Sequence, residues 1–206
     1  MLGGVALVGG SALITGCREN EEKKPATATA AQSMFNPDEV AFLDEVADTI
    51  LPTTSTPGAK AANVGQFMTT MVNDCYEEGD QKAFHEGLNK LNDASKKKFD
   101  KSFMEITPQQ RHDLLVDVDK ESKDYQKKVN DFNTNEGKKE KDELAKGNKN
   151  YKKDHMSPHY FMMMKQLTLL GFFTSEVGAT KAIRYIPVPG KFEGCVPYKK
   201  GDKLFI

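Results

Sequence analysis

Histidine is the side chain in this sequence best suited to holding a metal ion, but the residues between the two nearest histidines argue against such a site. His155 and His159 are four residues apart, the spacing of two ligands on one helical face. Ser157-Pro158, however, places a helix start between them. We therefore expect structural or solvent-exposed histidines, and the sequence predicts no metal ligands.

Methionine and aspartate side chains lead to the same expectation. Met162-Met163-Met164 could suggest copper, but consecutive residues point around a helix rather than at one ion, and methionine commonly fills irregular cores. Asp117 and Asp119 lack the glycine and the distal glutamate of a calcium loop. We expect these aspartates on the surface of a helix.

Motifs for catalysis and cofactor binding are also missing from the sequence. No Gly-rich nucleotide fingerprint lies between a strand and a helix, and there is no Cys-x-x-Cys-His haem attachment and no nucleophile elbow. The sequence thus predicts no catalytic and no cofactor-binding residues. We expect a chain that is not an enzyme on its own.

Charge and composition limit the classes of partner. The 206 residues include 29 Lys and Arg against 30 Asp and Glu, so there is no basic excess to bind nucleic acid. A hydrophobic content of 38% suffices for one core but not for a polytopic membrane protein. A single domain with solvated appendages is the expected organisation.

The N-terminal segment is typical of a targeting signal. Residues 1–14 are small, apolar and uncharged, as in the central region of a signal peptide. The next residues complete Ile-Thr-Gly-Cys, which resembles the lipobox of bacterial lipoproteins. We therefore expect residues 1–16 to be a signal peptide and Cys17 to be lipidated. An ordinary secretory signal with an incidental cysteine is the alternative.

Two further expectations concern the residues around this signal. A signal peptide needs a basic n-region, which the first four residues lack, so we expect translation to begin upstream, where a twin-arginine signal would lie. Residues 17–34 are charged and then rich in Ala, Thr and Gln, the composition of a flexible tether. The folded domain is expected over residues 35–206.

Within that domain, apolar residues recur at helical spacing and no strand pattern of useful length appears. Asn36-Pro37-Asp38-Glu39 predicts a capped helix start, and Pro52 predicts its end. Further helices are expected over residues 64–76, over residues 81–92, from Pro108 and from Pro158. The sequence predicts an all-α fold, a small helical bundle.

Two segments depart from this helical pattern. Residues 133–153 contain Lys, Glu, Asp, Asn and Gly with almost no apolar side chain, which predicts a charged insertion in the form of a solvated loop or extended hairpin. Residues 186–206 are rich in Pro and Gly, which predicts an extended tail.

The C-terminal third carries the most specific pattern in the chain. It reads Phe161-x-x-x-Lys165-x-Leu167-Thr168-x-x-Gly171-Phe172-Phe173-Thr174-Ser175-Glu176-x-Gly178 and then Tyr185-x-Pro187-Val188-Pro189-Gly190-x-Phe192-x-Gly194-Cys195-x-Pro197-Tyr198. The upstream loop reads Ile50-Leu51-Pro52-x-x-x-x-Pro57-Gly58-Ala59. Together these blocks resemble the gluconate 2-dehydrogenase subunit 3 family.

The resemblance implies a role in a dehydrogenase complex. Members are noncatalytic small subunits of periplasmic dehydrogenases whose large subunit is a flavoprotein of the glucose-methanol-choline type, and a cytochrome c often completes the complex. It implies FAD in the partner subunit and haem c in a third subunit, with a sugar, polyol or glycoside as substrate. Members support maturation of the flavoprotein, and several carry the twin-arginine signal for its export.

Location and an alternative function follow from these observations. A lipidated chain of this family is expected on the periplasmic side of the bacterial cell envelope, anchored to the membrane. The alternative is a free-standing bacterial lipoprotein that acts as a binding or interaction module.

The tail is the segment that we expect to contact the partner. Aromatic side chains on a stiff, extended backbone can wrap across another protein, although the tail could also fold back over its own bundle. The predicted interface consists of Phe172, Phe173, Glu176, Tyr185, Pro187, Pro189, Phe192, Cys195 and Tyr198.

Cysteine usage leaves two disulfides open. With Cys17 lipidated, Cys75 and Cys195 remain in an oxidising compartment. They could pair with each other, or Cys195 could bond to the large subunit. We favour the second pairing.

Overall fold

The structure is a computed structural model that describes residues 34–184 without a break and, in the tail, residues 186, 188, 190, 191, 195, 197 and 199–203. The elements in order are α1 (Pro37–Ile50), the 3-10 turn η1 (Ala59–Ala62), α2 (Val64–Cys75), α3 (Glu78–Phe99), α4 (Pro108–Ala145), α5 (Tyr160–Phe173) and the π-helical turn η2 (Gly178–Ala182). The described residues contain no strand, and the predicted all-α helical bundle is confirmed.

Side-chain caps fix where two of the helices begin. The Asn36 side chain accepts a hydrogen bond from the Glu39 N–H, and Glu39 accepts one from the Asn36 N–H, so α1 starts with the predicted capping box. Thr107 and Gln110 form the same reciprocal pair at the start of α4. The sequence therefore predicts both starts through local hydrogen bonding.

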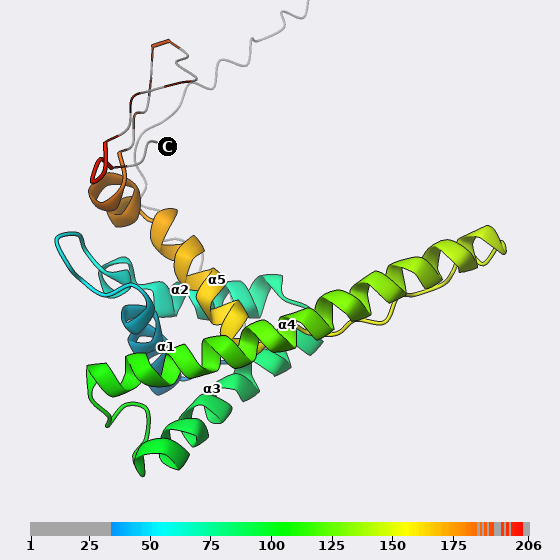
Figure 1. Ribbon diagram of the computed structural model, residues 1–206, viewed down its shortest axis with the longest axis horizontal. Coiled ribbons are helices and arrows are strands. Elements are labelled where there is room, and N and C mark those ends of the chain that lie inside the picture. The colour runs from blue at the N-terminus through cyan, green and yellow to red at the C-terminus, as the bar shows by residue number, and fades with distance from the viewer. Residues whose placement is uncertain are drawn as a thin grey trace, which may run out of the picture. The chain divides into compact units, whose positions relative to one another are not determined.

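Helix α5 lies at the centre of the bundle, where it contacts α1, α2, α3, α4 and η1 (Figure 1). Its inward side chains, among them Met163, Met164 and Leu167, are buried in the core. The interpretation of the methionines as core filler is thereby supported. Packing against the other four α-helices therefore fixes the position of α5 as a whole.

Close packing of α3 on α5 depends on a glycine. A Cβ atom added at Gly87 would lie 2.3 Å from the Cβ of Tyr160, well inside van der Waals contact. The backbone of α3 can approach α5 this closely because position 87 has no side chain.

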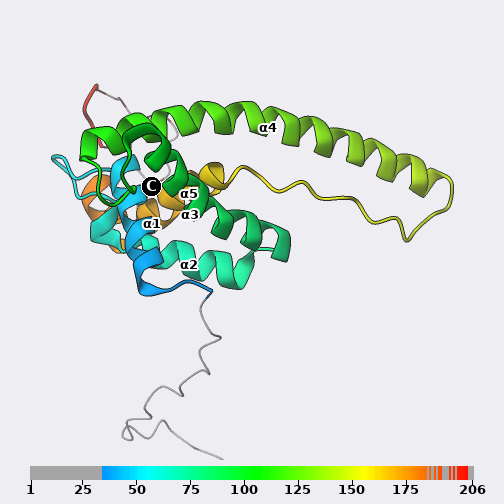
Figure 2. The same ribbon diagram turned by 90° about the horizontal axis from the view of Figure 1, so that it is seen from below.

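The expectation of a loop over residues 133–153 is wrong for its first part, because α4 continues to Ala145. Pairs of opposite charge one turn apart, such as Glu136 with Lys139 and Glu143 with Lys146, support the helix without apolar contacts. The return segment, residues 146–158, then runs back beside α4 without regular structure (Figure 2).

A buried carboxylate joins the return segment to the helix. Glu136 is only 2% exposed, and its Oε2 atom accepts hydrogen bonds from the Tyr151 hydroxyl at 3.0 Å and the Asp154 N–H at 3.3 Å. Lys139 pairs with the other oxygen. We call residues 126–158, the distal half of α4 and the return segment, the arm.

Two other helix boundaries differ from expectation. Helix α3 spans Glu78–Phe99 rather than residues 81–92, and it includes the half-buried Phe99. Helix α5 begins at Tyr160, two residues later than Pro158 suggests, because the His159 side chain caps it. In the tail, the described residues from 186 onward lie outside any helix.

Candidate interaction surface

Helix α5 presents an apolar face to solvent near its C-terminal end. Leu169, Leu170 and Phe173 are 39%, 46% and 38% exposed. Their spacing puts them on one side of the helix, while the buried side chains occupy the other sides. We call these three residues the α5 face. Large apolar side chains gathered in this way are typical of a protein–protein contact rather than of an isolated surface leucine.

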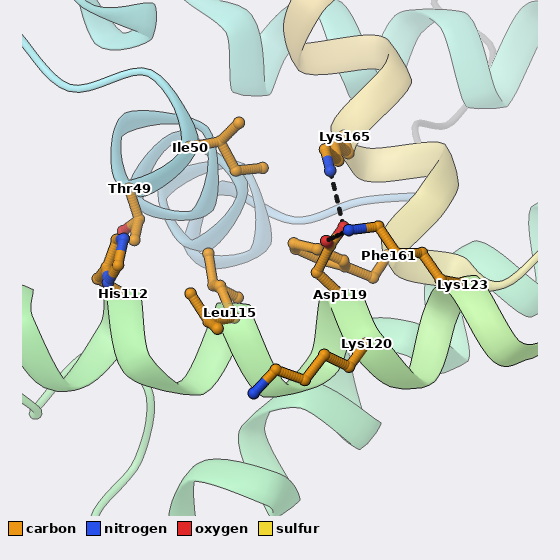
Figure 3. A pocket seen from close by; sticks show the side chains of 10 residues that line it. Thr49, Ile50, His112, Leu115, Asp119, Lys120, Lys123, Phe161 and Lys165 are labelled. Atoms are coloured by element: carbon orange, nitrogen blue, oxygen red, sulfur yellow. Dashed lines mark hydrogen bonds and ion pairs between the residues drawn. The ribbon is translucent and has the colours of Figure 1, made fainter.

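A groove of about 320 Å³ lies between α1, α4 and α5 (Figure 3). Its floor is apolar and includes Ile50 from α1, Leu115 and Val116 from α4, and Phe161 from α5. Its rim is basic, with Lys120 and Lys123 from α4, Lys165 from α5, and His112. We call it the lysine groove.

An aspartate inside the lysine groove links α4 to α5. The carboxylate of Asp119 accepts a hydrogen bond from Lys165 Nζ at 2.7 Å and pairs with Lys123 Nζ at 2.6 Å, as Figure 3 shows. The hydrogen bonds from Lys123 and Lys165 lower the pKa of the Asp119 carboxyl below its ordinary value. Asp119 therefore stays ionised at neutral pH and orients both ammonium groups at the rim.

The lysine groove and the α5 face meet along α5. Lys165 and Leu169 are four residues apart, so they are neighbours on the helix surface. A partner that covers the α5 face can therefore also reach the rim of the groove.

Comparison with protein families matches residues 37–190 to the family described as Gluconate 2-dehydrogenase subunit 3. The chain belongs to this family. The matched range contains every helix of the bundle, the α5 face and the lysine groove. A comparison with curated proteins and one with solved structures gave no match.

Membership of the gluconate 2-dehydrogenase subunit 3 family confirms the resemblance drawn from the sequence. It indicates an accessory subunit that associates with a dehydrogenase complex.

The predicted interface residues fall into three groups. Phe172 is 3% exposed and belongs to the core, so its assignment to a surface interface is wrong. Its side chain points into the bundle. Phe173, Glu176 and Cys195 are exposed. The others, Tyr185, Pro187, Pro189, Phe192 and Tyr198, lie outside the described residues, as does Cys17.

The two remaining cysteines are both exposed, and neither is in a disulfide in the structure. Cys75 ends α2 and Cys195 lies in the tail. Both pairings considered for Cys195 stay predictions.

The histidines have structural roles here. His159 is buried between the rings of Tyr125 and Tyr160, and its Nδ1 accepts the Phe161 N–H at the start of α5. Burial lowers the pKa of His159 and raises the pKa of Tyr160 to about 12. The exposed His155 contacts Asp80 at 2.8 Å. This agrees with the expectation of structural or exposed histidines.

The residues that the structure describes contain neither a metal-ligand cluster nor a membrane-spanning helix. No group of three or more His, Cys, Asp or Glu side chains in the described part of the chain could hold a metal ion. Among those residues, no helix combines the length and the apolar character that crossing a bilayer requires.

Sequence reasoning missed the α5 face and the lysine groove, although both leave a signal. Helix α5 is apolar nearly all round, and such a helix is either fully buried or keeps an apolar side for a partner. On α4, Lys120, Lys123 and Lys127 recur at positions i, i+3 and i+7, which lines up three positive charges along one side.

Proposed function

We propose that this chain is the noncatalytic small subunit of a periplasmic, flavin-dependent dehydrogenase of sugars, polyols or glycosides. Its partner is a flavoprotein large subunit of the glucose-methanol-choline type, which carries the FAD, and a cytochrome c with haem c completes the complex. The observation that carries this proposal is the family match over residues 37–190.

The exposed α5 face supports the docking part of the proposal. Burying Leu169, Leu170 and Phe173 against another protein would remove apolar area from water, which favours association. Phe173 is the last residue of α5, and the exposed Glu176 follows it three residues later in the sequence. The aromatic tail residues Tyr185, Phe192 and Tyr198 would extend the same contact.

Membrane anchoring and export form the second part of the proposal. Cleavage before Cys17 and its diacylglycerylation would tether the subunit to the membrane through residues 17–34, on the periplasmic side. A twin-arginine signal upstream would let the folded flavoprotein be exported together with this subunit. Changing Cys17→Ser should release the complex from membranes into the soluble fraction.

Co-expression with a candidate flavoprotein large subunit of the glucose-methanol-choline type tests the proposal. The tagged wild-type chain should capture the flavoprotein with a stoichiometric flavin spectrum and sugar-dependent dye reduction. The double variant Leu170→Asp with Phe173→Asp should lose capture, because apolar anchors at the centre of an interface cost about 2 kcal/mol or more when removed.

Leu144→Asp is the matched control, because Leu144 is an equally exposed leucine on the arm. It should leave capture unchanged. If the wild-type chain captures no flavoprotein, the function proposed here is wrong. If Leu144→Asp and the α5 double variant weaken capture equally, the α5 face is not the docking surface.

A further inference from the structure

The lysine groove continues beyond the hollow in Figure 3. A second hollow of about 670 Å³ is lined by Lys120, Lys123, Lys127 and Met162, so the two hollows share Lys120 and Lys123. Together they form a trough along one side of α4. A trough that is open along its length fits a chain segment better than a compact small molecule, which needs a pocket that encloses it.

Positive charges outnumber negative charges along this trough. The four lysines of the trough, Lys120, Lys123, Lys127 and Lys165, are paired with three carboxylates, those of Asp117, Asp119 and Asp124. The chain as a whole has a net charge of -1, so the positive excess is local. A complementary partner must bring negative charge.

The floor of the trough adds an apolar requirement. Val116 is 41% exposed, and Ile50 and Phe161 line the same recess. An anionic bilayer presents a flat surface of headgroups and cannot fill a recess between three helices. A peptide segment with both carboxylates and apolar side chains can.

We propose that the lysine groove binds an acidic, apolar-faced segment of the dehydrogenase large subunit. The proposal rests on the function proposed above and gives the chemistry of the partner segment. Lys120 and Lys127 are seven residues apart, a rise of roughly 10 Å along α4. The segment should therefore carry two or three Asp or Glu residues within roughly three extended residues or two helical turns, with an apolar side chain between them.

Photo-crosslinking in the intact complex identifies the occupant. A photoreactive amino acid placed at Val116 should crosslink to one peptide of the large subunit that contains both acidic and apolar residues. Val116 is partly exposed, so the replacement leaves the core intact. A crosslink to a basic segment, to a second copy of this chain or to its own N-terminal segment would overturn the proposal.

Charge variants test the same contact by affinity. Lys120→Gln with Lys123→Gln should weaken binding of the purified large subunit roughly tenfold and flatten the dependence of binding on salt. The matched control is Lys138→Gln with Lys141→Gln, which removes the same charge from exposed positions on the same helix. The control should bind and respond to salt as the wild-type chain does.

The outcomes separate this inference from the proposed function. If the wild-type chain and both double variants bind equally well, the accessory-subunit function holds and the groove proposal fails. If both double variants are weakened equally, the effect is one of net charge, and the groove proposal fails as well. If the wild-type chain itself does not bind, the proposed function fails first.

Discussion

In the bundle around α5, the large fully buried side chains are apolar, whereas in the part of the arm beyond Val129 the buried side chain is a carboxylate. Leu43, Met68, Phe84 and Met164 have no exposed surface in the bundle. Glu136 occupies the corresponding place in the arm, held by Lys139, Tyr151 and Asp154. One region is stabilised by removal of apolar area from water and the other by hydrogen bonds to a charge.

This difference bears on how the two regions open. Apolar burial is shared among many side chains, so the bundle should unfold cooperatively. The arm depends on a few polar contacts and on ion pairs within a helix, and regions with few buried apolar contacts open at lower free energy. We expect the arm to open independently of the bundle.

The largest effect should come from the centre of the bundle. Leu167→Ala should lower the free energy of unfolding by about 2–5 kcal/mol, because Leu167 is buried where α5 meets the other helices. Denaturant titration measures this loss. Leu144→Ala, in the exposed part of the arm, should change it by about 0.5 kcal/mol or less. Equal losses would mean that the two regions share one core.

Two glycines on helices give a matched test of the same contrast. Gly87→Ala should lower the free energy of unfolding by about 1–2 kcal/mol, since the new methyl group collides with Tyr160 and this outweighs the gain in helix propensity. Gly137→Ala, in the arm, meets nothing within 4 Å and should stabilise α4 locally by up to about 1 kcal/mol.

Hydrogen exchange can resolve the two glycine effects by region. Gly87→Ala should speed exchange throughout the bundle, and Gly137→Ala should slow exchange in the distal half of α4 alone. If Gly137→Ala instead raised the stability of the whole domain, the arm and the bundle would form one cooperative unit.

What the sequence could predict follows the same division. The α1 start and the buried face of α5 were readable because capping residues and apolar periodicity are local signals, as Asn36 and Leu167 show. The helical structure of the distal half of α4 could not be predicted. In the sequence Glu136 resembles any surface glutamate, and only the fold brings its donors Tyr151 and Asp154 next to it. A contact made by a return segment leaves no periodic pattern.

The exposure of the two neighbouring phenylalanines could be predicted only in part, for a similar reason. Phe173 was expected to be exposed and is, whereas Phe172 was assigned to the surface and is buried. Adjacent residues on a helix point about 100° apart. Two neighbouring phenylalanines therefore face different directions, and here one faces the core and the other faces solvent. The sequence does not say which one until the packing partners of α5 are known.

Glu136, the buried carboxylate of the arm, should make the arm sensitive to one substitution and to acid. Glu136→Gln keeps the shape of the side chain but removes the charge that Lys139 and Tyr151 bind. Hydrogen exchange should become faster in the distal half of α4 and around Tyr151, with exchange in the bundle unchanged. Melting of the bundle should stay at the wild-type temperature.

The pH dependence of the arm has a defined sign. The hydrogen bond from Lys139, with those from Tyr151 and Asp154, lowers the pKa of Glu136 below its ordinary value. A carboxyl with a lowered pKa stabilises the fold above its unfolded pKa and loses that contribution as the pH falls through the folded value. The arm of the wild-type protein should therefore open more readily below about pH 4, and Glu136→Gln should show a smaller acid response, with Glu143 supplying what remains because its pKa is also lowered.

The smallest effect should arise where the arm joins the bundle, at His159. Burial lowers the pKa of His159, so the unfolded chain takes up a proton before the folded chain does as the pH falls below about 6.5. Stability should consequently decline from pH 7 to pH 5. Asn at position 159 can accept the same Phe161 N–H but does not titrate in this range.

His159→Asn should therefore show a weaker decline in the free energy of unfolding between pH 7 and pH 5 than the wild-type protein, whatever its stability at pH 7. Denaturant titrations of both proteins at three pH values provide the measurement. Parallel curves would show that the proton uptake of His159 is the same folded and unfolded, and that the return segment enters the bundle through a junction insensitive to pH.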